Sequence, residues 1–234
     1  TFKNLELGAH YYYSRFDRVF YPEKGMLLRG FVSRSLLHDV DLLYSDPDFD
    51  EVIGSTNAFT KFGIDFQYRT PLGSRTSAII GTNLSFIAQD ALKGDDVSFT
   101  DYGYSAKYSL GGVLTAPRRG TYVFPGLNED EVFVTQMMNL QLGLQWKASF
   151  KLLLIPHFNL ASVGYDDFSE YIEDAFSPSG NWSEGFETSS IISAGVQFAY
   201  DSFMGPLNFD VSWVNDIDKV RVFFSVGLTF NRSN

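Results

Sequence analysis

The sequence has no cysteine, so neither disulfide bonds nor thiolate metal sites can stabilise the fold. It also lacks any apolar run near the roughly eighteen residues that a membrane-spanning helix needs. Basic residues are few: 18 Lys and Arg stand against 28 Asp and Glu, and a net charge of -10 argues against nucleic acid as a partner. No basic and apolar leader follows Thr1, so we expect any targeting signal to have been cleaved or to lie outside this sequence.

Aromatic residues and glycine are abundant instead, with 23 Phe, 13 Tyr and 20 Gly, a mixture that favours β-structure. The stretch NLQLGLQW, residues 139–146, shows the arrangement clearly. Its apolar side chains occupy every second position, at Leu140, Leu142, Leu144 and Trp146. Polar residues or glycine lie between them, which is the pattern of a strand with one apolar and one polar face.

The same alternation recurs in about ten segments, an even number, as an up-and-down barrel prefers. These segments cover residues 4–19, 25–45, 57–72, 76–91, 97–109, 132–149, 150–165, 188–202, 205–215 and 219–231. We therefore predict an all-β chain, one transmembrane antiparallel up-and-down β-barrel domain over residues 1–234. Two alternatives stay open, a barrel of about ten strands or part of a larger one of up to about sixteen.

A soluble β-sandwich would alternate too, so strand length and the chemistry of the polar face have to decide. Sandwich strands are usually about five or six residues long, whereas these segments reach the roughly 9–11 residues of a tilted membrane strand. The polar face carries mainly Gly, Ser, Asn, Gln and Thr, as a small crowded interior requires. We therefore expect the apolar face to contact lipid, because only a closed sheet pairs every strand backbone group in hydrocarbon.

The connections between the segments also alternate in length. Tight turns are predicted near Ser149 and Gly205, and long loops over residues 110–131 and 166–187. In outer-membrane barrels short turns face the periplasm, so we predict that the two long loops are extracellular and that the C-terminus is periplasmic. The linker 45–56 is an exception, because it is long on the side assigned to the periplasm. Residues 168–176 have helical spacing within the second long loop, which predicts a short helix there.

Four motifs resemble those of known outer-membrane barrels. Gly227 and Phe230, in SVGLTF, resemble the signal that directs such barrels to their insertion machinery. Three others resemble the superfamily that contains BamA, TamA and the two-partner secretion transporters. These are a D…P-x-x-G hairpin in residues 15–25, Gly111-Gly112 followed by Arg119-Gly120 and FPGL at 124–127, and DSFMGPL at 201–207.

The FPGL wording is most similar to the C-terminal outer-membrane barrels of patatin-like phospholipases. This resemblance implies that the loop with Arg119 and Gly120 folds into the lumen, where the arginine pairs with an acidic residue on the inner wall. Here Thr121 follows the Arg-Gly pair where the family has an aromatic residue. Five predicted strands follow the loop, as in the family, and only five precede it.

The implied function is a membrane-anchoring and translocation domain for an attached patatin-like hydrolase, without a catalytic site of its own. No serine has glycines at both two-residue offsets, so the nucleophile elbow of such a hydrolase is absent from these residues. The alternative is a noncatalytic barrel subunit of an outer-membrane assembly or transport complex. A barrel enzyme is a third reading, in which His157 and Asn159 on one polar face would use Ser193 or another inner serine.

The expected partners are outer-membrane lipid, the barrel assembly machinery during insertion, and an envelope protein complex. No cofactor and no metal are expected. The acidic residues Asp46, Asp48, Asp50 and Glu51 lack the glycine and the terminal glutamate of an EF-hand calcium loop. The expected location is the bacterial outer membrane.

Overall fold

In the computed structural model a single antiparallel sheet dominates the described residues, 2–42, 52–55, 58–89, 106–112, 120–165, 168–202, 205–217 and 219–227. Each strand pairs with its neighbour in the order β1-β2-β4-β5-β9-β10-β11-β12-β13, and β3 (Val52–Ser55) pairs with β2. The nine strands are β1 Phe2–Phe16, β2 Gly25–Leu42, β4 Phe59–Pro71, β5 Thr76–Gln89, β9 Gln136–Lys147, β10 Leu152–Gly164, β11 Ser189–Ser202, β12 Gly205–Val214 and β13 Lys219–Val226. The predicted all-β, antiparallel up-and-down class is confirmed.

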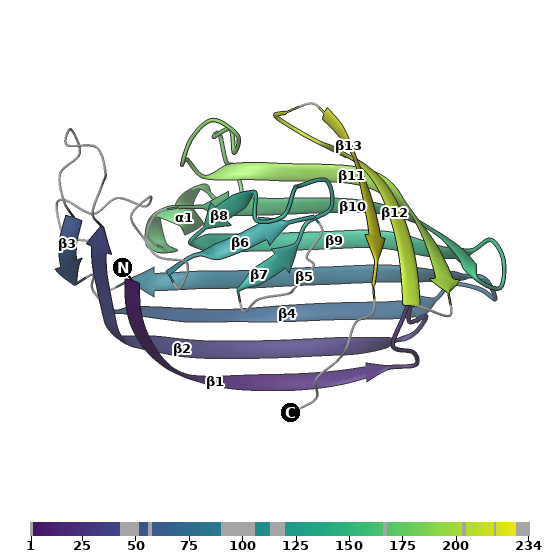
Figure 1. The fold of residues 1–234 in the computed structure, drawn as a ribbon, viewed down its shortest axis with the longest axis horizontal. Coiled ribbons are helices and arrows are strands. Elements are labelled where there is room, and N and C mark those ends of the chain that lie inside the picture. The colour runs from purple at the N-terminus through teal and green to yellow at the C-terminus, as the bar shows by residue number, and fades with distance from the viewer. Residues whose placement is uncertain are drawn as a thin grey trace.

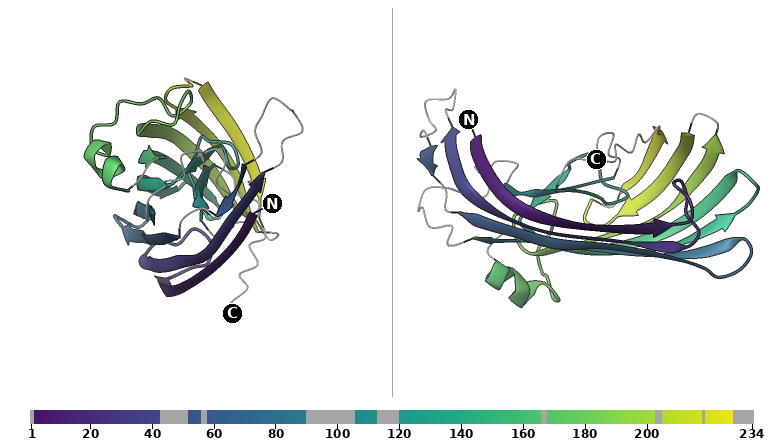
Figure 2. Two further views of the ribbon diagram at one scale, coloured as in Figure 1. Left: turned by 90° about the vertical axis from the view of Figure 1, so that its left-hand side faces the viewer. Right: turned by 90° about the horizontal axis from the view of Figure 1, so that it is seen from below.

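The sheet curves into a trough rather than lying flat (Figures 1 and 2). The path of pairing ends at β1 on one side and at β13 on the other, and within the described ranges no pairing joins these two strands. A second, smaller sheet lies on the concave side of the trough, as the end-on view of Figure 2 shows.

The two faces of the large sheet differ as the alternation predicts. On the convex face Leu142, Phe158 and Phe209 keep between 40% and 42% of their surface exposed. On the concave face small polar side chains are buried, as at Asn139 (2% exposed) and Ser193 (0%). The convex face therefore offers an apolar surface that only an apolar solvent would cover without cost.

Nine of the ten predicted segments are strands of this sheet, and the fifth is not. Residues 97–105 lie outside the described residues, and Tyr108–Gly111 forms β6, which belongs to the smaller sheet. Strand β5 pairs directly with β9, so that Asn83 lies opposite Asn139. The prediction of a barrel strand over 97–109 was therefore wrong, because a strand inside the trough has the same composition as a strand of its wall.

This correction removes the exception at the linker 45–56. With one segment fewer, the connection between β2 and β4 falls at the same end as the connections 90–135 and 165–188, which we call the long-loop end. The turns 17–24, 72–75 and 148–151 lie at the opposite, short-turn end, on the right of Figure 1, where β11 also ends and β12 begins. The three long connections thus all lie at one end, which also carries the short connection from Val214 to Lys219 between β12 and β13.

The helix predicted in the second long loop is present as α1 (Phe168–Asp174). It packs on the convex side of the trough, and Phe168 contacts the rings of Phe62 and Phe86 at centroid distances of 5.7 and 5.1 Å. Tyr171, on the side of the helix that faces the strands, is fully buried. In the described part of the chain, no helix combines the length and the apolar composition needed to cross a membrane.

The smaller sheet consists of β6 (Tyr108–Gly111), β7 (Thr121–Val123) and β8 (Val132–Val134), in the order β7-β6-β8. We call residues 106–112 and 120–134 the plug. Its buried side chains form the main hydrophobic core together with inward-pointing residues of the wall. That core contains Tyr108, Leu110, Phe124, Leu127 and Val134 from the plug, and Phe59, Ile87, Met137, Val163 and Ile191 from the wall.

The assignment of the two faces predicts unequal costs for two neighbouring substitutions in β9. Leu142→Arg places a charge near the middle of the apolar face and should cost about 2–4 kcal/mol of unfolding free energy. Gln141→Arg, on the concave face, loses only the hydrogen bond to the Val123 carbonyl and should cost about 1 kcal/mol. Equilibrium unfolding in lipid vesicles measures both, and equal costs would contradict the assignment.

Candidate functional site

The two segments of the plug pack on each other through positions where only glycine fits. A Cβ on Gly111 would lie 2.6 Å from the backbone nitrogen of Asp130, and one on Gly112 would lie 2.1 Å from the Leu127 carbonyl oxygen. The Gly112 N–H donates to that same oxygen at 2.9 Å. The two glycines of the predicted loop motif therefore allow β6 to lie against the returning segment of the plug.

Gly120, the third glycine of the motif, immediately precedes β7 and has a positive φ of 79°, which a residue with a side chain adopts only under strain. From there Tyr122 reaches the wall, and its hydroxyl lies 2.5 Å from the Ser85 Oγ. Tyr108 donates its hydroxyl hydrogen to the Phe86 carbonyl at 3.0 Å. Arg119, the predicted lumen arginine, lies outside the described residues.

The tip of the plug, residues 124–127, rests on β11 and β12. Gly126 has a φ of 93°, and a Cβ there would lie 2.3 Å from Val214 Cγ2 and 3.3 Å from the Ser212 Cβ. Phe124 and Leu127 on either side of it are fully buried. The FPGL motif thus forms a turn whose glycine packs directly against the inner wall.

An ion pair ties this tip to the last strand. Arg221, on the concave face of β13, donates through Nη2 to Glu131 Oε1 at 2.8 Å and through Nη1 to Glu131 Oε2. The same Nη1 donates to the Gly126 carbonyl at 3.1 Å. Both side chains are about four-fifths buried, at 19% and 21% exposure. A two-pronged pair of this kind is among the stronger contacts available to a charged side chain.

This contact is a different one from the contact that the family resemblance implies, because the predicted loop arginine, Arg119, lies outside the described residues. Here the plug carries the acid, Glu131, and the wall carries Arg221. Sequence reasoning missed both residues. The available signal was a guanidinium near the start of β13 on a polar face, a position that calls for a carboxylate partner.

Beneath the plug tip, the structure brings together the residues considered for a barrel enzyme. His157 Nδ1 lies 3.1 Å from the Asn159 amide nitrogen, and that amide donates to Ser193 Oγ at 3.2 Å. Asp210, which the sequence reasoning did not include, lies 2.8 Å from His157 Nε2. Ser212 donates to Asp210 and lies only 3.4 Å from the imidazole, so its hydroxyl hydrogen is engaged by the carboxylate. His10 lies elsewhere, stacked on Phe31 at 6.4 Å.

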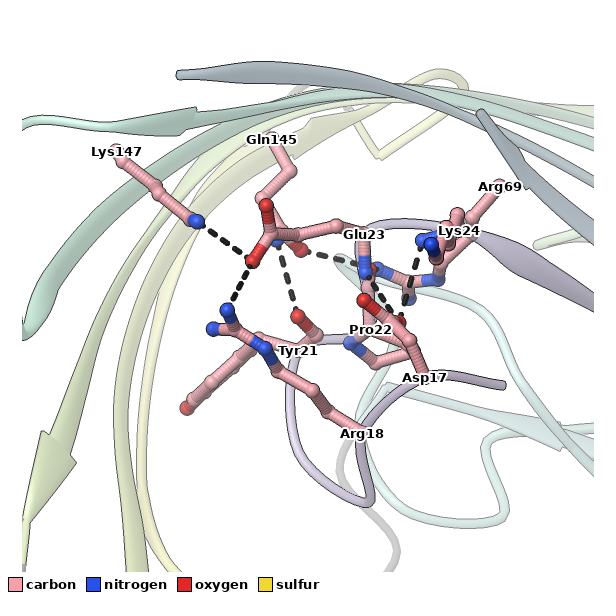
Figure 3. A network of polar contacts seen from close by, with 9 residues as sticks. All are labelled: Asp17, Arg18, Tyr21, Pro22, Glu23, Lys24, Arg69, Gln145 and Lys147. Carbon is pink, nitrogen blue, oxygen red and sulfur yellow. Dashed lines mark hydrogen bonds and ion pairs between the residues drawn. The ribbon is translucent and has the colours of Figure 1, made fainter. Parts of the chain in front are cut away.

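At the short-turn end, the turn 17–24 crosses the mouth of the trough (Figure 3). Tyr21 donates its hydroxyl hydrogen to Asn208 Oδ1 of β12 at 2.7 Å, and its carbonyl accepts from Gln145 Nε2 of β9 at 3.1 Å. Arg69 donates to the Pro22 carbonyl at 3.2 Å and to Gln145 Oε1 at 3.0 Å. The hairpin motif therefore reaches strands far from its own pair and closes this mouth.

The ring of Tyr21 packs into a small apolar cluster with Leu153, Ile155, Ala199 and Ile79. Burial, together with the negative charge of Asp201, raises the pKa of the Tyr21 phenol to about 12, so it stays a neutral donor to Asn208. Tyr21 adopts a φ of 46°, an uncommon value for a residue with a side chain. The contacts on both sides of the residue hold it in that conformation.

Charged groups stabilise the same turn. Glu23 pairs with Lys147 at 2.5 Å and with Arg18 at 2.7 Å. Partial burial acts to raise the pKa of Asp17, but hydrogen bonds from the Lys24 and Glu23 N–H groups outweigh it and lower that pKa. A carboxyl with a lowered pKa stabilises the turn at neutral pH, and this contribution is lost as the pH falls through the lowered pKa. Gly25 ends the turn at a φ of 124°.

The remaining predicted positions lie at the short-turn end or outside the described residues. Gly227 donates its N–H to the Pro206 carbonyl at 3.0 Å, and Phe230 of the predicted insertion signal is outside the described residues. So are Asp46, Asp48, Asp50 and Glu51. Within the described ranges, no group of three or more His, Asp or Glu side chains is placed to hold a metal ion.

Comparisons with known proteins agree with this architecture. A family model described as the Omp85 superfamily domain matches residues 1–230. The chain is similar to the crystal structure of BamA from Haemophilus ducreyi lacking POTRA domains 1-3, with a TM-score of 0.60 and 17% identity. That likeness, which concerns the fold, covers 94% of this chain and 41% of the BamA chain. No curated protein sequence matches the chain.

The ion pair between plug and wall predicts that Glu131→Gln loosens the plug. The substitution leaves the guanidinium of Arg221 without its carboxylate and should cost about 1.5–3 kcal/mol. Amide hydrogen exchange at residues 124–127 should accelerate, because the plug tip would open more often. Glu173→Gln, on the exposed side of α1, is the matched control and should change neither quantity. Exchange at the tip that is the same in both variants would show that the pair does not hold the plug.

The contacts of Tyr21 predict graded effects on the closure of the short-turn mouth. Tyr21→Phe loses only the hydrogen bond to Asn208, about 0.5–1.5 kcal/mol, whereas Tyr21→Ala also loses the apolar cluster, about 1.5–3 kcal/mol more. Trypsin cleavage after Arg18 and Lys24 in the folded protein should therefore accelerate slightly in the first variant and strongly in the second. Equal cleavage rates in the wild type and Tyr21→Ala would mean that the turn is not held by this residue.

Proposed function

The chain belongs to the Omp85 superfamily of outer-membrane β-barrels, and we propose that it acts as a noncatalytic barrel that anchors an attached domain in the bacterial outer membrane. The observation that carries this proposal is the occupied concave face. The plug occupies the long-loop half through the main core and leaves a cavity of 630 Å³ against β1 and β2, and the turn 17–24 crosses the other mouth. An interior occupied from both ends supports an anchoring role over that of an open pore.

The attached domain that we propose is a patatin-like hydrolase. Support comes from the plug tip, because FPGL at 124–127 is the segment most similar to the barrels of patatin-like phospholipases. Gly126 packs so closely against Val214 that a side chain would not fit there, which explains why this motif has a glycine in this chain. A gene that encodes a G-x-S-x-G hydrolase domain in frame with these residues would support the pairing.

The proposed orientation places the short-turn end in the periplasm and the long-loop end outside the cell. The position of all three long connections at one end of the sheet supports it. Strand β13 runs from Lys219 at the long-loop end to Val226 at the short-turn end, so the C-terminal residues would leave the membrane on the periplasmic side. An epitope tag inserted at residues 148–151 should then stay inaccessible to antibody in intact cells.

The filled interior predicts low or no conductance for the protein in planar lipid bilayers. Combining Glu131→Gln with Tyr21→Ala loosens both the plug and the turn, so current events should become more frequent than in either single variant. Glu173→Gln should behave as the wild type. Large, stable open-channel currents from the wild-type protein would refute a closed interior and with it the anchoring proposal.

An experiment in cells separates anchoring from the alternative, a barrel subunit of an assembly or transport complex. Removing the barrel from the gene should release the attached domain from the membrane fraction and leave other outer-membrane proteins at normal abundance. A general loss of other barrel proteins would instead favour an assembly role. Lipase activity in the isolated 234 residues would favour the barrel enzyme.

A further inference from the structure

A groove of 280 Å³ lies on the convex face of the trough, between the chain that follows α1 and strands β5, β9 and β10. Its lining is mainly apolar, with Thr82, Asn139, Ser162 and Ser190 as the polar residues. The strands contribute Leu84, Met138, Leu140 and Leu160, and the chain at the end of α1 contributes Ala175 and Phe176.

Contacts between α1 and the strands set the shape of this groove. The Tyr171 hydroxyl donates to the Ser162 carbonyl at 3.0 Å and also lies 3.2 Å from the Ser162 Oγ. Gly164 leaves room for the ring, since a Cβ there would lie 2.4 Å from the Tyr171 Cδ2. Phe168 adds its ring contacts with Phe86 and Phe62. The groove is therefore formed before any ligand enters it.

The groove lies at membrane depth. Ser162 and Leu160 are two and four residues inward from the end of β10 at Gly164, which is roughly 7 and 13 Å of strand length. The lipid-facing band of an outer-membrane barrel is about 25 Å tall, so these rows fall inside it. Leu140 and Leu160 are 39% and 38% exposed, and their row continues into Leu142 and Phe158. The floor of the groove is thus continuous with the surface that faces lipid.

The wall of the groove also suits an apolar environment. Phe176 is 84% exposed and Ile172 38% exposed, both on the segment that overhangs the strands. Aromatic side chains at this level of a barrel belong to the boundary between headgroups and acyl chains. Of the polar lining residues, Ser162 is already engaged by Tyr171 and Asn139 by Asn83. A ligand with many hydrogen-bonding groups would find little to bind here.

We propose that this groove is a lipid site that holds one acyl chain of an outer-membrane lipid against β9 and β10, beneath the overhang of α1. Such a site differs from the general solvation of the barrel by lipid, because its acyl chain contacts the strands on one side and the chain that follows α1 on the other. The proposal depends on the superfamily and on the fold, and it does not depend on the anchoring function.

The test uses vesicles of phosphatidylethanolamine that contain a fraction of the same lipid with a diazirine in its acyl chain. After illumination of the reconstituted protein, mass spectrometry locates the adducts. We expect peptides with Met138, Leu140 and Leu160 to be labelled several-fold more than the convex-face residues Phe198 and Phe209. Uniform labelling of the convex face would show ordinary solvation and overturn the proposal.

Two pairs of variants make the result specific. Phe176→Ala removes the wall and should reduce the excess labelling, whereas Phe150→Ala, which alters another highly exposed Phe (97%) at the far end of the hairpin, should not. Thr82→Trp fills the groove, whereas Thr70→Trp changes an outward position of β4 away from it. Excess labelling that persists in Phe176→Ala and Thr82→Trp would refute the site. Absence of labelling from this region in the wild type would refute it as well and would indicate a protein partner over the groove.

Discussion

A backbone N–H or C=O group left unpaired in hydrocarbon costs several kcal/mol, and this penalty governs the design of the whole chain. The seven strands between β1 and β13 on the path of the large sheet satisfy it by pairing on both sides with their neighbours. Because a strand has two faces, the side chains must then alternate between lipid and the interior. The period-two pattern of the sequence and the apolar convex face are both consequences of that single requirement.

The concave face does not contact lipid, so its apolar side chains must be buried and its polar side chains must be hydrogen-bonded by other parts of the chain. The chain divides this face into two regions. Towards the long-loop end, inward positions such as Ile87, Val163 and Ile191 are apolar, and the plug covers them. Towards the short-turn end, inward positions such as Gln145 and Asn208 are polar, and the turn 17–24 supplies their hydrogen-bond partners. The inner face is therefore matched, region by region, to the segment that fills it.

The local pattern of the sequence was sufficient for nine strands and for α1, because both follow from the spacing of apolar residues within one segment. It failed for residues 97–109, since Tyr108 and Leu110 are buried by the wall in the same manner as wall residues are buried by the plug. Counting 97–109 as a wall strand also placed the long linker 45–56 at the end of the short turns. Removing that strand from the wall corrects both the strand count and the position of the linker. The contact of Tyr21 with Asn208 joins residues 187 positions apart, and no periodicity within a segment encodes such a contact.

The ion pair of Glu131 with Arg221 is a two-pronged contact between the plug and the wall, in which the plug supplies the carboxylate. Its position in the chain is important, because β13 is the last described strand and the plug belongs to the connection between β5 and β9. The plug tip can therefore be fully seated only when β13 has joined the sheet. Tyr21 likewise connects the β1–β2 turn to β12, so both fillings link separate parts of the trough and help to hold its curvature.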